Sequence, residues 1–152
     1  MDDFKLSEHF SFFELTGTSH EELQLANRLD AIKYKKQLTY NAHALEEIRY
    51  VLGVPLKVSS GYRNNALNIV VKGSSTSKHK IGLCSDILPI GMTVQEAFKK
   101  LSANKDKLHS ARKIIIEGVG KDAWLHCQAK QEAKEVLELY TSSDTKTFTK
   151  VS

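Results

Sequence analysis

A β-hairpin in the last third of the sequence constrains the fold of this chain more than any other feature. Residues 113–117 (KIIIE) have a β-branched centre, which is typical of a strand. Gly118-Val119-Gly120 follows as a turn, and residues 123–129 (AWLHCQA) match the returning strand of a hairpin. The chain is therefore expected to contain an antiparallel sheet with this hairpin in it.

The returning strand has one apolar and one polar face. Side chains alternate along a strand, so Leu125, Cys127 and Ala129 share a face. This apolar face is the natural core face. His126 lies on the opposite face, and we expect it to look into a cleft beside Trp124.

The sequence before the hairpin alternates helical and extended patterns. From about Arg28 to Leu52 the apolar residues recur at helical spacing, and Gly53 ends the pattern. The apolar positions are Leu38, Ala42, Leu45, Ile48 and Leu52. Residues 56–60 and 85–90 have the character of short strands. A capping-box pair, Thr93 and Glu96, predicts a helix through about Ala103.

Three segments give weaker signals. Residues 7–15 are predicted to form a short ordered lead-in, and residues 61–78, rich in turn formers, a long loop. Residues 136–141 fit either a strand or a helix end, and the last dozen residues are expected to fray. The whole pattern predicts an α+β fold with a mainly antiparallel sheet and helices packed on one side, in a single domain spanning 1–152.

Composition limits the partners and the cellular setting. The 152 residues are 41% hydrophobic and 26% charged, a typical globular balance, and no apolar run approaches the length of a membrane span. A net charge of +4 favours anionic partners, either nucleic acid or an anionic cell wall. The lysines are scattered without interleaved aromatics, which disfavours nucleic acid. We expect a monomer that binds neither nucleic acid nor membrane.

The N-terminus lacks the pattern of a secretory signal peptide. We therefore expect synthesis in a cytosol, unless a phage-type route releases the protein to the cell wall. Under these conditions Cys84 and Cys127 are predicted to be free thiols. The absence of a CxxC pair removes support for a zinc finger.

Two polar residues stand in apolar strand sequences and need a reason to be there. Asp86 lies within CSDILPI and His126 within AWLHC. A carboxylate in such surroundings is costly unless it is paired or binds a metal. His79 would complete a set of two histidines and one carboxylate, and zinc in hydrolases takes three such ligands and leaves a fourth position open. The alternative is that His79 lies on a surface loop and His126 bonds to backbone in the core. The remaining histidines, His9, His20, His43 and His109, are not singled out.

Four segments in order resemble elements of a known family. Residues 77–86 (SKHKIGLCSD) resemble the SxHxxGxAxD motif of the zinc D-Ala-D-Ala carboxypeptidase and L-alanyl-D-glutamate endopeptidase family. Residues 60–63 (SGYR) with 67–68 (LN) resemble its SGYR…LN element, and residues 124–126 (WLH) its WxH element. The lead-in, 6–10 (LSEHF) with 14–15 (EL), is similar to a phage and bacterial branch. The resemblance covers about residues 6–128 and leaves 130–152 as a terminal strand or tail.

This resemblance implies a hedgehog/DD-peptidase-like fold and one Zn²⁺ per chain, held by His79, Asp86 and His126. It implies that Arg63 binds or polarises the substrate peptide, with Ser77 holding the loop and Trp124 beside the substrate. The implied substrates are peptidoglycan stem peptides, and the implied activity is a metallopeptidase hydrolase that degrades cell wall in the manner of an endolysin. Which peptide bond is cut stays open.

The sequence departs from the family pattern at two positions. The small alanine of the motif is Cys84, which either packs as a small apolar residue or competes as a ligand. The acidic residue three positions before the last histidine is replaced by Ala123. Glu117, at the end of the preceding strand, is our preferred general base, and Asp122 is the second choice. The strand-end glutamate also resembles the hedgehog signalling domain, so a zinc-stabilised binding module without catalysis is the alternative function.

Overall fold

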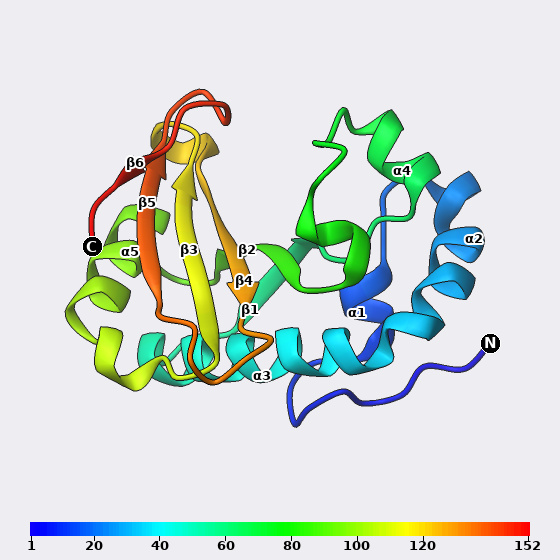
Figure 1. Ribbon diagram of the computed structural model, residues 1–152, viewed down its shortest axis with the longest axis horizontal. Helices are drawn as coiled ribbons and strands as arrows, with labels where there is room; N and C mark the ends of the chain where they lie inside the picture. Colours follow the sequence, from blue (N-terminus) through cyan, green and yellow to red (C-terminus); the bar gives the residue numbers. More distant parts are fainter.

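The fold is built on a six-stranded sheet whose strands do not follow chain order. The computed structural model describes residues 1–152. The strands are β1 (Leu56–Ser60), β2 (Cys84–Pro89), β3 (Ala111–Glu117), β4 (Trp124–Ala129), β5 (Glu138–Ser142) and β6 (Thr149–Lys150). Their order in the sheet is β1-β2-β4-β3-β5-β6 (Figure 1). All neighbours are antiparallel except β3 and β5, which run parallel, so the expected α+β class with a mainly antiparallel sheet is confirmed.

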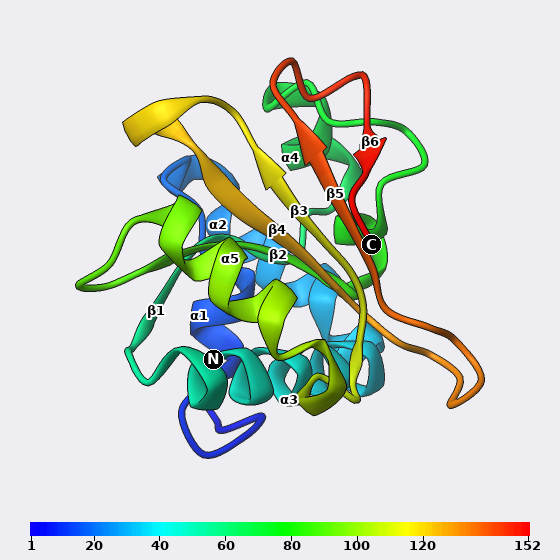
Figure 2. The ribbon, with the colours of Figure 1, turned by 90° about the vertical axis from the view of Figure 1, so that its left-hand side faces the viewer.

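Helices cover one face of the sheet and extend past its β1 edge. The helices are α1 (Phe12–Thr16), α2 (Glu21–Ala31), α3 (Lys35–Leu52), α4 (Asn65–Val70) and α5 (Val94–Ala103). Single 3₁₀ turns occur at η1 (Ile32–Tyr34), η2 (Lys78–Ile81), η3 (Lys105–Lys107) and η4 (Gly120–Asp122). Figures 1 and 2 show α3 and α5 against the sheet, with α1, α2 and α4 grouped beyond β1. The other face of β2, β4 and β3 is left without a helix of its own.

The strand alternation predicted for the hairpin is confirmed. Its apolar side chains, Leu125, Cys127 and Ala129, are buried, and Cys127 belongs to the main core. That core also contains the apolar row of α3, including Leu38 and Leu45. Each such side chain contributes about 1.5–3 kcal/mol by leaving water, and this fixes which face of β4 points away from the helices.

The predicted helix from Arg28 to Leu52 is two helices with a turn between them. The chain forms α2, bends through η1, and continues as α3. No proline or glycine marks the break. Ile32 is 51% exposed, so the apolar row of α3 does not extend back through it. Gly53 ends α3 in the left-handed conformation at φ 73°, as the sequence predicted.

The expected loop 61–78 contains a helix, α4. Asn64 is the N-cap of this helix, and its side-chain oxygen accepts a hydrogen bond from the Leu67 amide. The helix has only six residues and ends without a glycine, so its period is too short to stand out in the sequence. The capping box of Thr93 and Glu96, by contrast, is present and opens α5.

The C-terminal residues add strands to the sheet. Of the two alternatives for 136–141, the strand is correct, since β5 pairs in parallel with β3. The tail expected to fray after it pairs as β6 with β5. No helix combines the length and the apolar character needed to cross a membrane.

A buried asparagine ties α2 to the segment that carries Arg63. The side-chain NH₂ of Asn27 donates to the backbone carbonyls of Thr16 and Tyr62 at 2.9 and 3.0 Å. Its side-chain oxygen accepts from the backbone N–H of Asn64 at 2.7 Å. Its side chain is fully buried. Three backbone groups therefore depend on this one side chain for their hydrogen bonds.

We predict that Asn27→Ala lowers the free energy of unfolding by about 3 kcal/mol, because it leaves these backbone groups buried without partners. Urea denaturation measures the change. Asn65→Ala is the matched control, since Asn65 is exposed at the start of α4 and makes no side-chain hydrogen bond, and it should change stability by about 0.5 kcal/mol or less. Equal effects of the two substitutions would contradict the assigned role of Asn27.

Candidate metal centre and its cavity

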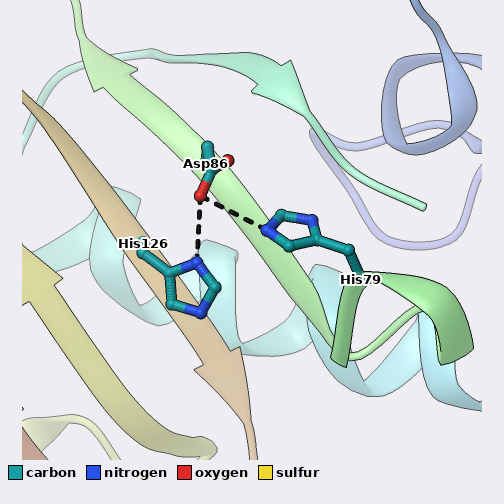
Figure 3. A group of neighbouring side chains, drawn as sticks. All are labelled: His79, Asp86 and His126. Carbon is teal, nitrogen blue, oxygen red and sulfur yellow. Dashed lines mark hydrogen bonds and ion pairs between the residues drawn. The ribbon is translucent and has the colours of Figure 1, made fainter. Parts of the chain in front are cut away.

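Three side chains that are distant in sequence converge on one carboxylate oxygen. Oδ1 of Asp86 lies 3.0 Å from Nδ1 of His126 and 3.4 Å from Nε2 of His79 (Figure 3). The three ligand atoms all lie within 4.8 Å of one another. The two imidazole rings meet edge to face, with centroids 5.1 Å apart. The sequence predicted these three residues as a set, and the fold brings them together.

The sheet positions two of the three residues directly. Asp86 on β2 is the antiparallel partner of His126 on β4, and paired residues project to the same face. That face is the one opposite the buried Leu125 and Cys127. The expectation that His126 looks away from the core is therefore confirmed.

The backbone of the preceding loop positions His79. Because a carbonyl can only accept, Nδ1 of His79 carries the proton and donates to the Gly61 oxygen at 2.7 Å, which leaves Nε2 free toward Asp86. Gly61 itself lies against α1, where an added Cβ would come within 2.2 Å of the Leu15 oxygen. Only glycine fits at this approach. Gly82 ends the 3₁₀ turn in the left-handed conformation at φ 79°, which also favours glycine.

The electrostatics of the trio are those of a buried ion pair. Burial alone would lower the pKa of His126, but its interactions with Asp86 and Cys84 together outweigh burial and raise the pKa to about 10. Burial opposes ionisation of Asp86, yet His79 and His126 hold the pKa of this carboxyl well below its usual range. Burial lowers the pKa of His79, while its contact with Asp86 acts in the opposite direction. The free Nε2 of His79, the ring of His126 once a metal has displaced its proton, and the ionised Asp86 carboxylate together form a donor set that suits zinc.

Glu117 stands next to the trio. Its Oε1 lies 3.7 Å from Nδ1 of His126, and the residue is 9% exposed at the end of β3. Burial raises the pKa of this carboxyl above its ordinary value. The site thus contains two carboxylates whose pKa values are shifted in opposite directions.

Arg63 and Ser77 form the rim above His79. The Ser77 hydroxyl oxygen accepts from the His79 amide at 3.2 Å and, more weakly, from the Arg63 guanidinium at 3.5 Å. The Arg63 amide donates to the His79 oxygen at 3.1 Å. The 3.5 Å contact with Ser77 is the one hydrogen bond that the Arg63 side chain makes, so most of the guanidinium N–H groups are free.

A cavity of about 610 Å³ joins these groups. All the predicted site residues except Asp122 line it: Arg63, Ser77, His79, Asp86, Glu117, Trp124 and His126. Asp122 is exposed in the hairpin turn, and Ala123 is buried in the core. Cys84 is buried beside the site and contributes to the raised pKa of His126, but it is not part of the converging group.

The cavity also has a wall that the sequence reasoning missed. Residues of the C-terminal segment line it, together with two from the hairpin strands: Lys113, Gln128, Tyr140, Thr145 and Phe148. Lys113 and Gln128 could have been found, because they share the strand faces of Glu117 and His126 by alternation. The other three depend on the parallel pairing of β5 with β3, for which the sequence gives no local signal.

The α+β fold thus brings together a histidine–aspartate–histidine group that could hold a metal ion and places it in a cavity. The sequence model of the Peptidase M15 family matches residues 9–128, and the chain belongs to this family. No curated protein is similar enough to be matched with the chain. Membership in the family indicates a metallopeptidase and agrees with a metal at the converging group.

We predict that the metal-free protein loses stability as pH rises from 6.5. His126 has its folded pKa raised to about 10 from 6.5, so its ion pair contributes fully below pH 6.5 and is lost as pH rises through 10. One proton corresponds to at most about 1.4 kcal/mol per pH unit. Denaturation between pH 6.5 and about 8, below the range of thiol and lysine titration, measures the slope. His126→Gln should lack this component, and equal slopes in the two proteins would contradict the assignment.

Proposed function

We propose that this protein is a zinc-dependent peptidase that cleaves the stem peptides of peptidoglycan. The observation that carries the proposal is the His79–Asp86–His126 group in a cavity with a buried glutamate, Glu117, beside it. Family membership supports the hydrolase class, and the geometry supports the roles that follow. The substrate class rests on the family resemblance and on the cationic character of the chain.

His79, Asp86 and His126 would hold one zinc ion per chain. Zinc bound there would act as a Lewis acid on the scissile carbonyl and lower the pKa of the attacking water. Asp86 contributes the negative charge that offsets part of the cation, and Gly61 fixes the ring of His79 so that Nε2 points to the centre.

Glu117 is the proposed general base. A base must lie near the reacting water and have a pKa close to the working pH. Glu117 lies beside His126, and burial moves the pKa of its carboxyl upward, in the direction that a general base requires. Its carboxylate would take a proton from the attacking water and pass it to the leaving amine. Asp122 stays outside the cavity, which favours Glu117 over it.

Arg63 and Trp124 are the proposed substrate contacts. A guanidinium offers several donors in a plane and suits a carboxylate or a carbonyl oxygen of a peptide. Ser77 would hold the Arg63 side chain and the His79 loop together, and Trp124 would supply an apolar wall next to Glu117. These positions fit either a D-Ala-D-Ala carboxypeptidase or an L-Ala-D-Glu endopeptidase.

Digestion of purified sacculi tests the proposal directly. The zinc-loaded protein should release peptide fragments, and a chelator should abolish the release. If the zinc protein cuts neither sacculi nor stem peptides, the alternative of a zinc-stabilised binding module holds, and Glu117 is then an acid that only orients the metal site.

We predict that His126→Ala loses the metal and melts at a lower temperature than the zinc-loaded wild type, because a metal bound only by the folded state stabilises that state. Metal analysis and thermal denaturation measure the two effects. His43→Ala is the matched control, since His43 is exposed on α3. Full zinc content in a His79→Ala/His126→Ala double variant would show that the site is assigned wrongly.

We predict that Glu117→Gln lowers turnover by about 10²-fold or more with zinc still bound, the usual contribution of a general base. Steady-state hydrolysis of a stem peptide, alongside metal analysis, measures this. Asp122→Asn should cost far less. If Glu117→Gln turns over as fast as the wild type, the base is another group.

A further inference from the structure

We propose that Lys113 is a specificity-determining residue that binds a carboxylate of the substrate, in a second charged subsite of the same cavity. The inference rests on the proposed function and adds to it the position of an anionic group on the substrate. Three observations carry it: the placement of Lys113 on the cavity floor, the absence of any acidic partner, and the aromatic wall beside it.

The floor of the cavity has an acid at one end and a cation at the other. Glu117, Ile115 and Lys113 alternate along β3 and so project to the same face, and all three line the cavity. Ile115 is the strand partner of His126. Glu117 and Lys113 are four residues apart, or about 13 Å along the strand, with the metal group beside the middle of this line.

Lys113 is positioned by its neighbours on the two adjoining strands, β4 and β5. Its partner on β4 is Gln128, two residues beyond His126, and its partner on β5 is Glu138. Its ammonium lies 5.3 Å from the centre of the Tyr140 ring. A ring face holds a cation by its quadrupole without neutralising it. The Lys113 ammonium is therefore held at the cavity wall and remains available to bind an anion.

No carboxylate of the protein pairs with Lys113. The acids nearest in the sheet are engaged elsewhere, because Glu138 makes ion pairs with Arg112 and Lys150, and Arg112 also pairs with Glu135. Lys113 itself makes neither an ion pair nor a side-chain hydrogen bond. A half-buried cation in a cavity with its acidic neighbours already paired is complementary to an anion from outside.

The charge of the whole cavity agrees with an anionic ligand. Its lining has four cationic side chains, Arg63, Lys72, Lys78 and Lys113, against two acids, Asp86 and Glu117. The two acids lie at the metal group, so the excess of positive charge lies away from it. Arg63 and Lys113 come from different sides of the metal group, one from the rim and one from the floor, and this provides for two separate anionic groups.

The turn between β5 and β6 borders the cavity at the Glu117 end of β3, because Ser142, which precedes the turn, is the parallel partner of Glu117. Asp144 organises this turn by accepting hydrogen bonds from the amides of Lys146 and Thr147 at 2.9 and 2.7 Å. Thr145 and Phe148 then face the cavity across from the 71–78 segment.

The geometry defines what the ligand must carry. Lys113 lies two residues along the strand direction from the Ile115–His126 pair, about 7 Å, which is the length of two residues of an extended peptide. The preferred substrate is thus a peptide with a free carboxylate, on a side chain or at a chain end, one or two residues from the scissile bond.

Matched peptides test this inference. Each pair has the same sequence and differs only in a carboxylate or the corresponding carboxamide, one or two residues to either side of the bond that is cut. The wild type should prefer the carboxylate peptide of one pair. Lys113→Met should reduce kcat/KM for that peptide by about 10- to 100-fold, mainly through KM, and leave the carboxamide peptide unchanged. Lys113→Arg should retain part of the preference.

Lys57→Met is the matched control, because Lys57 is exposed on β1, lies outside the cavity, and loses the same charge. If Lys113→Met and Lys57→Met both keep the wild-type preference for the carboxylate peptide, the subsite is wrong and the peptidase proposal stands. The subsite would also be overturned if Lys113→Met retained zinc but lost its activity on the carboxylate and the carboxamide peptide equally.

A binding measurement separates the inference from the proposed function. Trp124 is the single tryptophan and lines the same cavity, so its fluorescence reports binding without turnover. The zinc-loaded wild type should bind the carboxylate peptide more tightly than the carboxamide, and Lys113→Met should bind both equally. If the wild type cleaves nothing but shows this selectivity, the peptidase proposal fails and the subsite holds. If the wild type binds both peptides equally, the subsite falls whatever the catalytic result.

Discussion

The site depends on one largely buried carboxylate that two imidazoles face. Asp86 lies on an interior strand of the sheet, where an ionised group without partners would cost several kcal/mol. His126 compensates it from the neighbouring strand, and Nε2 of His79 faces the same oxygen from the loop above. The pair with His126 is charged in the absence of metal, and a divalent cation can replace the proton that His126 carries. The same arrangement therefore satisfies the carboxylate in both states.

The third member of the group depends on contacts far from the metal. His79 is held by the Gly61 carbonyl, and the segment after Gly61 is held by Asn27 and by the Leu15 oxygen, which accepts from the Tyr62 amide at 2.7 Å. The N-terminal helices α1 and α2 thus act as the support of the loop that brings His79 to the sheet (Figure 1). This explains why a domain with its reactive groups on β2, β3 and β4 includes helices beyond the β1 edge.

The sequence allowed the sheet part of the site to be predicted more fully than the loop part. Alternation on the hairpin placed His126 opposite Cys127, and the cost of a carboxylate in an apolar strand drew attention to Asp86. These inferences rest on local periodicity, which a strand must obey. The break between α2 and α3 and the short helix α4 follow from tertiary contacts, such as those of Asn27, and leave no periodic trace. His79 was identified through a motif resemblance rather than through its surroundings, because its position depends on Gly61, eighteen residues earlier.

The cavity residues that could be predicted from the sequence and those that could not have different proposed roles. The metal group, Arg63 and Glu117 all lie within the residues that match the family, 9–128. Tyr140, Thr145 and Phe148 lie beyond that match and reach the cavity only because β5 joins β3 in parallel. A parallel neighbour needs a crossover, and here the chain passes through residues 130–137 before it runs beside β3 again. The proposed reactive groups thus lie on strands that pair with their sequence neighbours, while the proposed substrate-binding wall comes from a late addition to the sheet edge. Such a wall can change in sequence without disturbing Asp86 or His126, because β3 separates β5 from the strand that carries His126.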